Sequence, residues 1–226
     1  MTASGTVIAF ENPVLLIGGG ELDGELAARY AAQGYAVIAA DGGANRLVQS
    51  GLRLDAIIGD LDSLKDRAGW EARTKVIEIT EQDTTDFEKC LYSTSAPFYL
   101  ALGFTGRQFG HTLAALHVLT RYGSSKKVLM VDSVDVVFAT RAPFEMQMQP
   151  GERLSVYPLG PVEFASSEGL KFPLQGLHME QGRLIGTSNE AVSHKVSITP
   201  VHGNTQAYAI VAPLTHLGEF IAAMGA

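Results

Sequence analysis

The first 140 residues alternate short apolar segments with helix-like segments, and this alternation constrains the fold most. Five β-branched or apolar runs are typical of strands: residues 14–17, 35–39, 56–58, 75–79 and 98–102. Residues 21–33 and 111–122 lie between such runs and repeat apolar side chains every three or four positions, which indicates amphipathic helices. Strands that alternate with helices predict a parallel sheet covered on both faces.

The pattern changes from about residue 142 onward. Prolines interrupt short segments in which apolar and polar residues alternate, such as residues 153–157, 192–198 and 207–211. This is typical of an all-β module. We therefore expect two domains, an α/β domain over residues 1–140 and an all-β domain over residues 141–226, with the boundary placed by the change of period alone.

Charge and cysteine content exclude several classes of protein. The net charge is -7 and lysines and arginines form no run, so neither nucleic acid nor a membrane surface is an expected partner. The single cysteine, Cys90, excludes an internal disulfide, and residues 1–4 lack the features of a secretory signal. The longest apolar stretch, residues 128–139, is interrupted by Asp132 and Asp135 and is too short for a membrane helix. We expect a cytoplasmic protein.

Polar residues follow four of the predicted strands. The four segments are Asp41-Gly42-Gly43-Ala44-Asn45, Gly59-Asp60-Leu61-Asp62-Ser63, Gln82-Asp83-Thr84-Thr85-Asp86 and Gly103-Phe104-Thr105-Gly106-Arg107. Ligands of open parallel sheets bind outside the carboxyl ends of the strands. The carboxylates of these segments, together with one arginine, are therefore predicted to face a common edge.

Carboxylates that meet at a sheet edge repel one another unless a cation neutralises them. Oxygen ligands without a cysteine or histidine cluster suit Mg²⁺ rather than zinc. Gly42, Gly43 and Gly106 allow backbone N–H groups to approach phosphate oxygens, and Arg107 offers a planar fork for negative charge. The segments predict a magnesium ion that carries a polyphosphate.

Each feature also has a structural explanation. Asp41 or Asp60 alone could cap a helix or form a turn, Asp62 with Ser63 could cap a helix over residues 64–73, and Thr85 could cap the helix that follows it. Residues 18–20 are three glycines after the first strand, but their spacing is not that of a dinucleotide-binding turn. Cys90 has no activating neighbour and is expected in the core.

Six sequence blocks resemble the signature of thiamine pyrophosphokinases in order and spacing. They are Asp41-Gly42-Gly43-Ala44-Asn45, Gly59-Asp60-Leu61-Asp62-Ser63, Gln82-Asp83-x-Thr85-Asp86-Phe87-x-Lys89, Gly103-x-x-Gly106-Arg107, Gly169-Leu170-Lys171-Phe172-Pro173-Leu174 and Ser188-Asn189-Glu190. The resemblance implies a Rossmann-like N-terminal domain, a C-terminal β-sandwich, Mg²⁺ with ATP as the co-substrate, and a homodimer with active sites between subunits.

The resemblance also implies roles for individual residues. Asp60, Asp62 and Asp86 would hold the metal and, with Arg107, carry the catalysis, with Asp86 as the candidate proton acceptor. The residues implied around the nucleotide are Asp41, Gly42, Gly43, Asn45, Gln82, Thr85 and Gly106. Ser188 and Asn189 would contact thiamine across the dimer interface.

One position departs from the resemblance. Gly110 stands where the family loop carries an aspartate. It motivates one alternative to thiamine pyrophosphokinase activity, a relative that binds thiamine or its diphosphate without catalysis. Because related pyrophosphokinases share the carboxylate motifs, transfer to another alcohol, such as a pterin, is a second alternative. A nucleotide-binding oxidoreductase, suggested by the early glycines, is a third.

Overall fold

The computed structural model describes residues 8–225, so residues 1–4, where a secretory signal was looked for, lie outside the described residues. Its strands are β1 (Ile8–Ala9), β2 (Val14–Ile17), β3 (Ala36–Ala40), β4 (Ala56–Gly59), β5 (Lys75–Glu78), β6 (Thr94–Ser95), β7 (Tyr99–Leu102), β8 (Val128–Val131), β9 (Asp135–Thr140), β10 (Phe144–Gln147), β11 (Arg153–Pro158), β12 (Val162–Glu168), β13 (His178–Met179), β14 (Gly186–Glu190), β15 (Lys195–Pro200) and β16 (Tyr208–Pro213). Its helices are α1 (Gly24–Ala32), α2 (Arg67–Glu71), α3 (Asp86–Ser93), α4 (Phe109–Val118), α5 (Ser124–Lys126) and α6 (Leu217–Met224), with short helical turns η1 (Asp41–Arg46), η2 (Leu119–Gly123) and η3 (Leu214–His216).

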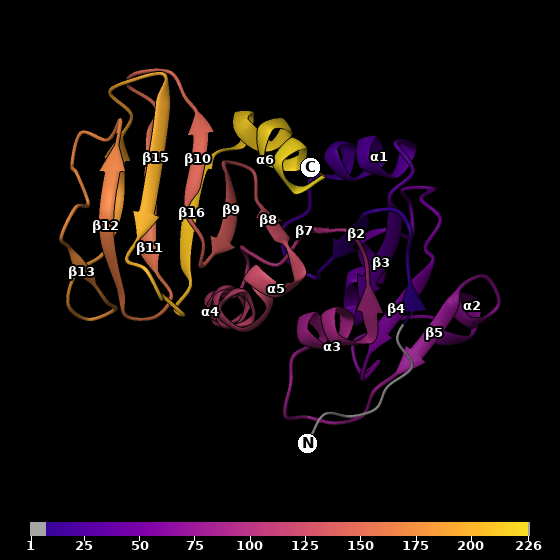
Figure 1. Ribbon diagram of the computed structural model, residues 1–226. Helices are drawn as coiled ribbons and strands as arrows, with labels where there is room; N and C mark the ends of the chain where they lie inside the picture. Colours follow the sequence, from indigo (N-terminus) through magenta and orange to yellow (C-terminus); the bar gives the residue numbers. More distant parts are fainter. Residues whose placement is uncertain (1–7, 226) are drawn as a thin grey trace.

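One ten-stranded sheet runs through the molecule in the order β14-β11-β16-β9-β8-β7-β2-β3-β4-β5 (Figure 1). The half that contains β8, β7, β2, β3, β4 and β5 is parallel, whereas β9, β16, β11 and β14 pair in antiparallel fashion. The chain is therefore a mixed α/β protein. The predicted parallel sheet is confirmed for the first half of the sequence.

Helices cover both faces of the parallel half, as the alternating sequence pattern predicts. All four residues of β2 are fully buried. Leu15 and Ile17 face the cluster that contains residues of α1 and α6, whereas Val14 and Leu16 face the cluster formed with α3 and α4. These helices lie above and below the sheet in Figure 1. A continuous apolar run in this part of the chain thus becomes a strand buried on two sides.

The residues that cap α3 and α2 show which of the predicted helix caps form. Thr85 caps α3 and forms a capping box with Glu88, so its predicted capping role is confirmed. Asp66, not Asp62 or Ser63, caps the short helix α2, which begins at Arg67. The alternative in which Asp62 and Ser63 cap a helix is therefore wrong.

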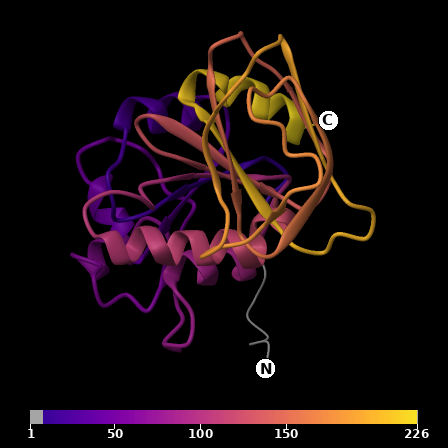
Figure 2. The same cartoon turned by 90° about the vertical axis from the view of Figure 1, so that its left-hand side faces the viewer.

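The C-terminal half contains a second, separate sheet in the order β10-β15-β12-β13. Its apolar side chains share one core with the antiparallel part of the long sheet, where the rings of Phe164 and Tyr208 meet edge to face at 5.2 Å. The C-terminal strands, in orange and yellow, lie in front of the indigo and magenta elements in Figure 2. The change of period near residue 140 is not a break in the long sheet, because β9 pairs with both β8 and β16.

Within residues 8–225, none of the helices has both the length and the apolar character needed to cross a membrane.

Candidate active site

A cavity of 370 Å³ opens at the carboxyl ends of β2, β3, β4 and β7, beside the first turns of α3 and α4. This is the edge of the sheet where the sequence predicts ligand binding. Eight predicted site residues line the cavity: Asp41, Gly42, Gly43, Asp60, Gln82, Thr85, Asp86 and Gly106.

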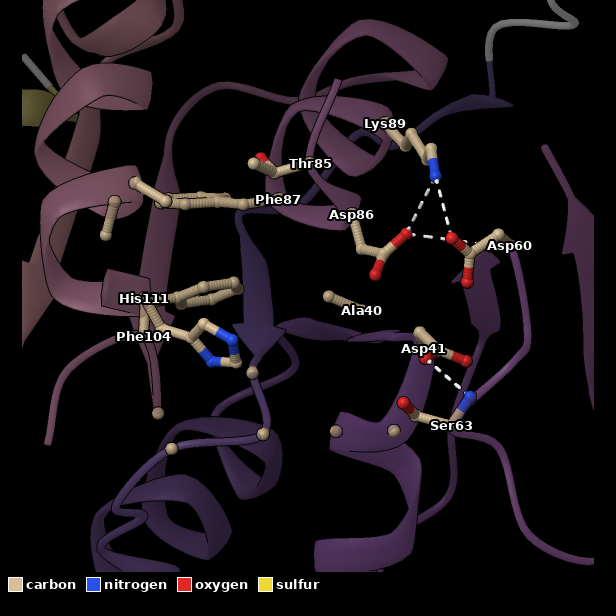
Figure 3. A pocket seen from close by; sticks show the side chains of 18 of the residues that line it. Ala40, Asp41, Asp60, Ser63, Thr85, Asp86, Phe87, Lys89, Phe104 and His111 are labelled. Carbon is tan, nitrogen blue, oxygen red and sulfur yellow. Dashed lines mark hydrogen bonds and ion pairs between the residues drawn. The ribbon is translucent and has the colours of Figure 1, made fainter. Parts of the chain in front are cut away.

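Three carboxylates meet in this cavity. Asp41, Asp60 and Asp86 each present an oxygen, and the three oxygens lie within 4.8 Å of one another (Figure 3). Asp41 follows β3, Asp60 follows β4, and Asp86 begins α3. Separate turns thus bring oxygen ligands to one point at a spacing suited to a bound cation.

Asp41 is the most enclosed member of the cluster, with 3% of its surface exposed. Its Oδ2 accepts a hydrogen bond from the backbone N–H of Ser63 at 3.1 Å, whereas Oδ1 is buried without a partner among the described residues. Burial raises the pKa of Asp41, and the negative charge of Asp86 raises it further. A buried carboxylate oxygen without a donor is a position where a cation would lower the free energy of the folded protein.

Asp60 and Asp86 have opposite electrostatic surroundings. The hydrogen bond from Gln82 Nε2 to Asp60 Oδ2, at 3.0 Å, is the main cause that lowers the pKa of Asp60. Burial raises the pKa of Asp86, although its contacts with Lys89 oppose this effect. Of the two carboxyl groups, Asp60 is therefore the more readily ionised and Asp86 the more readily protonated.

Lys89, which the sequence analysis did not include among the site residues, lies next to two of the carboxylates. Its Nζ is 3.1 Å from Asp86 Oδ1 and 3.5 Å from Asp60 Oδ2, and its side chain is 1% exposed. Burial lowers the pKa of Lys89, but the hydrogen bond and the negative charge of Asp86 outweigh it, so the net shift is upward. The sequence could have indicated this contact, because residues three positions apart on a helix, such as Asp86 and Lys89, lie on the same face.

Two glycines make room for this arrangement. A Cβ atom at Gly43 would lie 2.2 Å from the carbonyl oxygen of Ile17, so only glycine allows the turn after β3 to pack against β2. A Cβ atom at Gly59 would lie 2.6 Å from Cβ of Asp41 and 3.0 Å from Oδ1 of Asp86. Gly59 thus keeps open the space in which the carboxylates converge.

The opposite wall of the cavity is aromatic. The ring of Phe104 stacks on Phe87 with centroids 3.9 Å apart, and His111 lies beside Phe104 (Figure 3). Arg46 donates hydrogen bonds to the carbonyl oxygens of Gly19 and Gly20 and fixes the glycine turn after β2. The cavity therefore offers apolar contact on one side and acidic ligands on the other.

Three residues predicted for the metal and nucleotide site do not line the cavity. The side chain of Asp62 faces solvent and accepts a hydrogen bond from Ser63 Oγ at 2.8 Å. Asn45 links the carbonyl of Ser63 and the N–H of Lys65, so it braces the turn. Arg107 is exposed and has a left-handed backbone with φ of 58°. Asp41, rather than Asp62, completes the carboxylate cluster.

The predicted thiamine residues lie elsewhere, on β14. Ser188 is exposed, whereas Asn189 is buried and accepts a hydrogen bond from the N–H of Phe172 at 3.0 Å and donates one to its carbonyl at 2.7 Å. These two bonds hold Phe172 in a fixed loop while 60% of the residue stays exposed. Phe172 lies within one of the family-like blocks but was not among the predicted site residues.

A cavity lined by carboxylates and glycine turns at the carboxyl ends of parallel strands is where α/β enzymes bind their ligands, so the fold and the site are those of an α/β enzyme. The chain matches the family model described as "Thiamin pyrophosphokinase, catalytic domain" over residues 27–131. It also matches "Thiamin pyrophosphokinase, vitamin B1 binding domain" over residues 143–203. The chain belongs to the thiamin pyrophosphokinase family.

Individual relatives agree with this assignment. The chain is 30% identical to thiamine pyrophosphokinase 1 of Arabidopsis thaliana over 194 residues, which cover 71% of this chain and 73% of that protein. It is 32% identical to thiamine pyrophosphokinase 2 of the same plant over 187 residues, 67% of this chain and 69% of that protein. The similarity to thiamine pyrophosphokinases therefore extends beyond the six family-like blocks to about two thirds or more of the chain.

Solved structures share the fold. Thiamin pyrophosphokinase from Candida albicans superposes with a TM-score of 0.73 at 16% identity and covers 94% of both chains. The enzyme from Geobacillus thermodenitrificans gives 0.72 at 21% identity, over 89% of this chain and 97% of that one. At these identities the likeness shows the architecture of the long mixed sheet and the separate antiparallel sheet.

Proposed function

We propose that this chain transfers the pyrophosphoryl group of ATP to the hydroxyl of thiamine, which yields thiamine diphosphate and AMP. The cluster of Asp41, Asp60 and Asp86, in a cavity lined by glycine turns, is the observation that carries the proposal. A triphosphate needs close backbone approach and a divalent cation, and the cavity provides for both.

The donor set fits Mg²⁺. All three side chains offer oxygen, and the buried Oδ1 of Asp41 has no hydrogen-bond partner among the described residues. We propose that Asp41, Asp60 and Asp86 hold the ion, with Asp62 outside its direct reach. When bound, Mg²⁺ would neutralise charge on the phosphate oxygens of ATP.

The chain's own residues position the reactants for in-line transfer. The thiamine hydroxyl oxygen bonds to the β-phosphorus of ATP, the bond from that phosphorus to the α–β bridging oxygen breaks, and AMP leaves with that oxygen. Asp86 is the candidate acceptor of the hydroxyl proton, through the carboxylate oxygen that does not contact Lys89. Gln82 holds Asp60 ionised, and Thr85 caps the helix that begins with Asp86. Positioning of this kind supplies most of the acceleration in phosphoryl transfer.

A single chain leaves the site incomplete, which supports a homodimer. Strand β14, with Ser188 and Asn189, and strand β3, which precedes Asp41, are separated in the long sheet by β11, β16, β9, β8, β7 and β2. At about 4.8 Å between neighbouring strands, the two sites are roughly 30 Å apart. Reacting atoms must approach within about 3.5 Å. We propose that the thiamine-binding residues of one subunit face the carboxylate cluster of its partner.

Phe172 completes the proposed thiamine site. Its ring is exposed while Asn189 fixes its backbone, an arrangement suited to stacking on a flat aromatic or cationic ring. Asn189 then acts through Phe172, and Ser188 is the exposed polar contact.

We also propose that the two domains bind different substrates. We assign ATP and Mg²⁺ to a Rossmann-like domain over residues 1–140 and thiamine to a β-sandwich domain over residues 141–226. The two family models fall on either side of this boundary. A cytoplasmic location is part of the same proposal, supported by the single and fully buried Cys90.

The test is an assay of AMP release from ATP with thiamine, in the presence and absence of Mg²⁺. We expect AMP and thiamine diphosphate in equal amounts only when both thiamine and Mg²⁺ are present. Equal or faster release with a pterin alcohol would contradict thiamine as the acceptor. Calorimetry that shows tight binding of thiamine diphosphate without any AMP release would instead indicate a non-catalytic binding protein.

A further inference from the structure

Lys89 is an almost fully buried lysine whose charged end touches two carboxylates of the cluster. Its side chain is 1% exposed, and Nζ lies 3.1 Å from Asp86 Oδ1 and 3.5 Å from Asp60 Oδ2. Lysines are almost never fully buried unless they are paired. The partners of this lysine are both members of the proposed metal site, so its placement concerns that site.

Lys89 lines the cavity next to Asp60 and Asp86, and the helix fixes its position relative to these carboxylates. Asp86 and Lys89 are separated by one turn of α3, so both side chains lie on the same face of the helix. In Figure 3 the ammonium group lies on the side of Asp60 and Asp86 that is away from Asp41. The contact therefore leaves the space between the three carboxylates open.

The charges of the cluster match one divalent cation. When all three are ionised, the carboxylates carry three negative charges and Lys89 carries one positive charge, so three minus one leaves two negative charges for a cation to neutralise. Without Lys89, the carboxylates of Asp60 and Asp86 would face each other with only the metal to hold them together.

We propose that Lys89 is a positioning residue, a fixed internal cation that clamps Asp60 and Asp86 in the arrangement that accepts a single divalent cation between them and Asp41. This inference rests on the proposed function of the same site. It means that the site stays assembled before the metal arrives, with the ammonium group supplying part of the missing charge. Loss of the lysine makes the folded protein dependent on divalent metal.

Thermal melting of Lys89→Met, with and without Mn²⁺, tests the proposal. Methionine has a similar length, so the change removes mainly the charge and the hydrogen bond. Without metal we expect a fall in melting temperature of at least about 4 °C, because buried carboxylates lose their partner. Saturating Mn²⁺ is expected to recover at least half of the loss, since the ion replaces the missing positive charge. Wild type, whose cluster keeps two uncompensated negative charges, is also expected to gain stability, but by less than Lys89→Met.

Lys126→Met is the matched control. Lys126 is also partly buried, but its Nζ donates to the carbonyl oxygen of Thr94 and forms no ion pair with a carboxylate of the described residues. Any loss of stability in this variant is expected to be insensitive to Mn²⁺. A Lys89→Met protein that melts like wild type without metal, or whose loss Mn²⁺ leaves unchanged, would overturn the proposal.

A charge-restoring double variant separates electrostatics from packing. Asp86→Asn keeps the oxygen that accepts the N–H of Asp60 while removing one negative charge. Combined with Lys89→Met, it is expected to melt at a higher temperature without metal than Lys89→Met alone. A lower melting temperature would mean that Lys89 acts through packing only. Melting requires neither ATP nor thiamine, so these results stand apart from the outcome of the AMP-release assay.

Discussion

Replacement of Gly59 by alanine tests whether the spacing of the carboxylates controls activity. The new Cβ atom would lie 2.6 Å from Cβ of Asp41 and 3.0 Å from Oδ1 of Asp86. Ordinary contacts of this kind begin near 3.4 Å, so Asp41 must move by the difference of 0.8 Å between 3.4 and 2.6 Å. The substitution therefore enlarges the cluster without removing any of its functional groups.

The size of the effect follows from this displacement. Misplacement of reacting or positioning groups by about 1 Å costs about 100-fold in rate. Overpacking a tight site costs about 1 to 3 kcal/mol of folding free energy. For a chain of this size each kcal/mol lowers the melting temperature by about 2 to 4 °C. We expect Gly59→Ala to release AMP about 100-fold more slowly and to melt several degrees lower.

The assay compares kcat/KM for AMP release, alongside a melting curve, in Gly59→Ala and in a control. Gly24→Ala is the matched control, because a Cβ atom at Gly24 would meet nothing within 4 Å. The control is expected to keep wild-type activity and stability. If Gly59→Ala keeps its activity within about threefold, close approach of the carboxylates does not govern the rate, and the reasoning fails.

Three further predictions concern single groups. Asp60→Asn is expected to lower AMP release by at least about 100-fold, because loss of a metal ligand costs several kcal/mol; a loss within tenfold would contradict its metal role. Burial raises the pKa of Asp41 in the folded protein. Above this raised pKa the ionised carboxylate lowers the free energy of unfolding, and this destabilisation disappears as the pH falls and Asp41 becomes protonated. Metal-free Asp41→Asn should therefore unfold at a higher denaturant concentration than wild type at neutral pH. The difference should shrink as the pH falls toward the ordinary pKa range of aspartate, and a difference that does not change with pH would refute this. Phe172→Ala is expected to raise KM for thiamine by about 2- to 10-fold without changing KM for ATP. Val192 is another exposed apolar residue, and Val192→Ala should change neither KM value. An unchanged KM for thiamine in Phe172→Ala would exclude stacking.

The sequence predicts the parallel half of the fold well, because local pattern and burial agree there. Residues 14–17 form a continuous apolar run, and all four are fully buried in the central strand β2. The convergence of Asp41, Asp60 and Asp86 follows from the same topology, since turns after neighbouring parallel strands share an edge.

Side-chain direction within the turns could not be predicted. Leu61 has a left-handed backbone with φ of 66°, and the turn around it leaves Asp60 in the cavity and Asp62 in solvent. Asp41 also has a positive φ, of 41°, which is uncommon for a residue other than glycine. Such conformations depend on tertiary contacts, so neither spacing nor the family resemblance revealed that Asp41, and not Asp62, joins Asp60 and Asp86 in the cluster.

The continuation of the sheet into the C-terminal half was also hidden from the sequence. Asp132 accepts the N–H groups of Val134 and Asp135 and forms the turn between β8 and β9. Of the two aspartates that interrupt the apolar stretch, Asp132 thus forms the turn and Asp135 begins strand β9. Pairing of β9 with β16 joins residues 68 to 78 positions apart, from Thr140 with Tyr208 to Asp135 with Pro213, and no local sequence pattern indicates such a pairing.

A crystal structure with Mg²⁺ and a non-hydrolysable ATP analogue tests most directly whether the carboxylates of separate turns hold the cation that carries the nucleotide. We expect an ion about 2.1 Å from oxygens of at least two of Asp41, Asp60 and Asp86 and from phosphate oxygens of the analogue. An ion held by the phosphates alone, or a nucleotide bound outside this cavity, would contradict the proposed site.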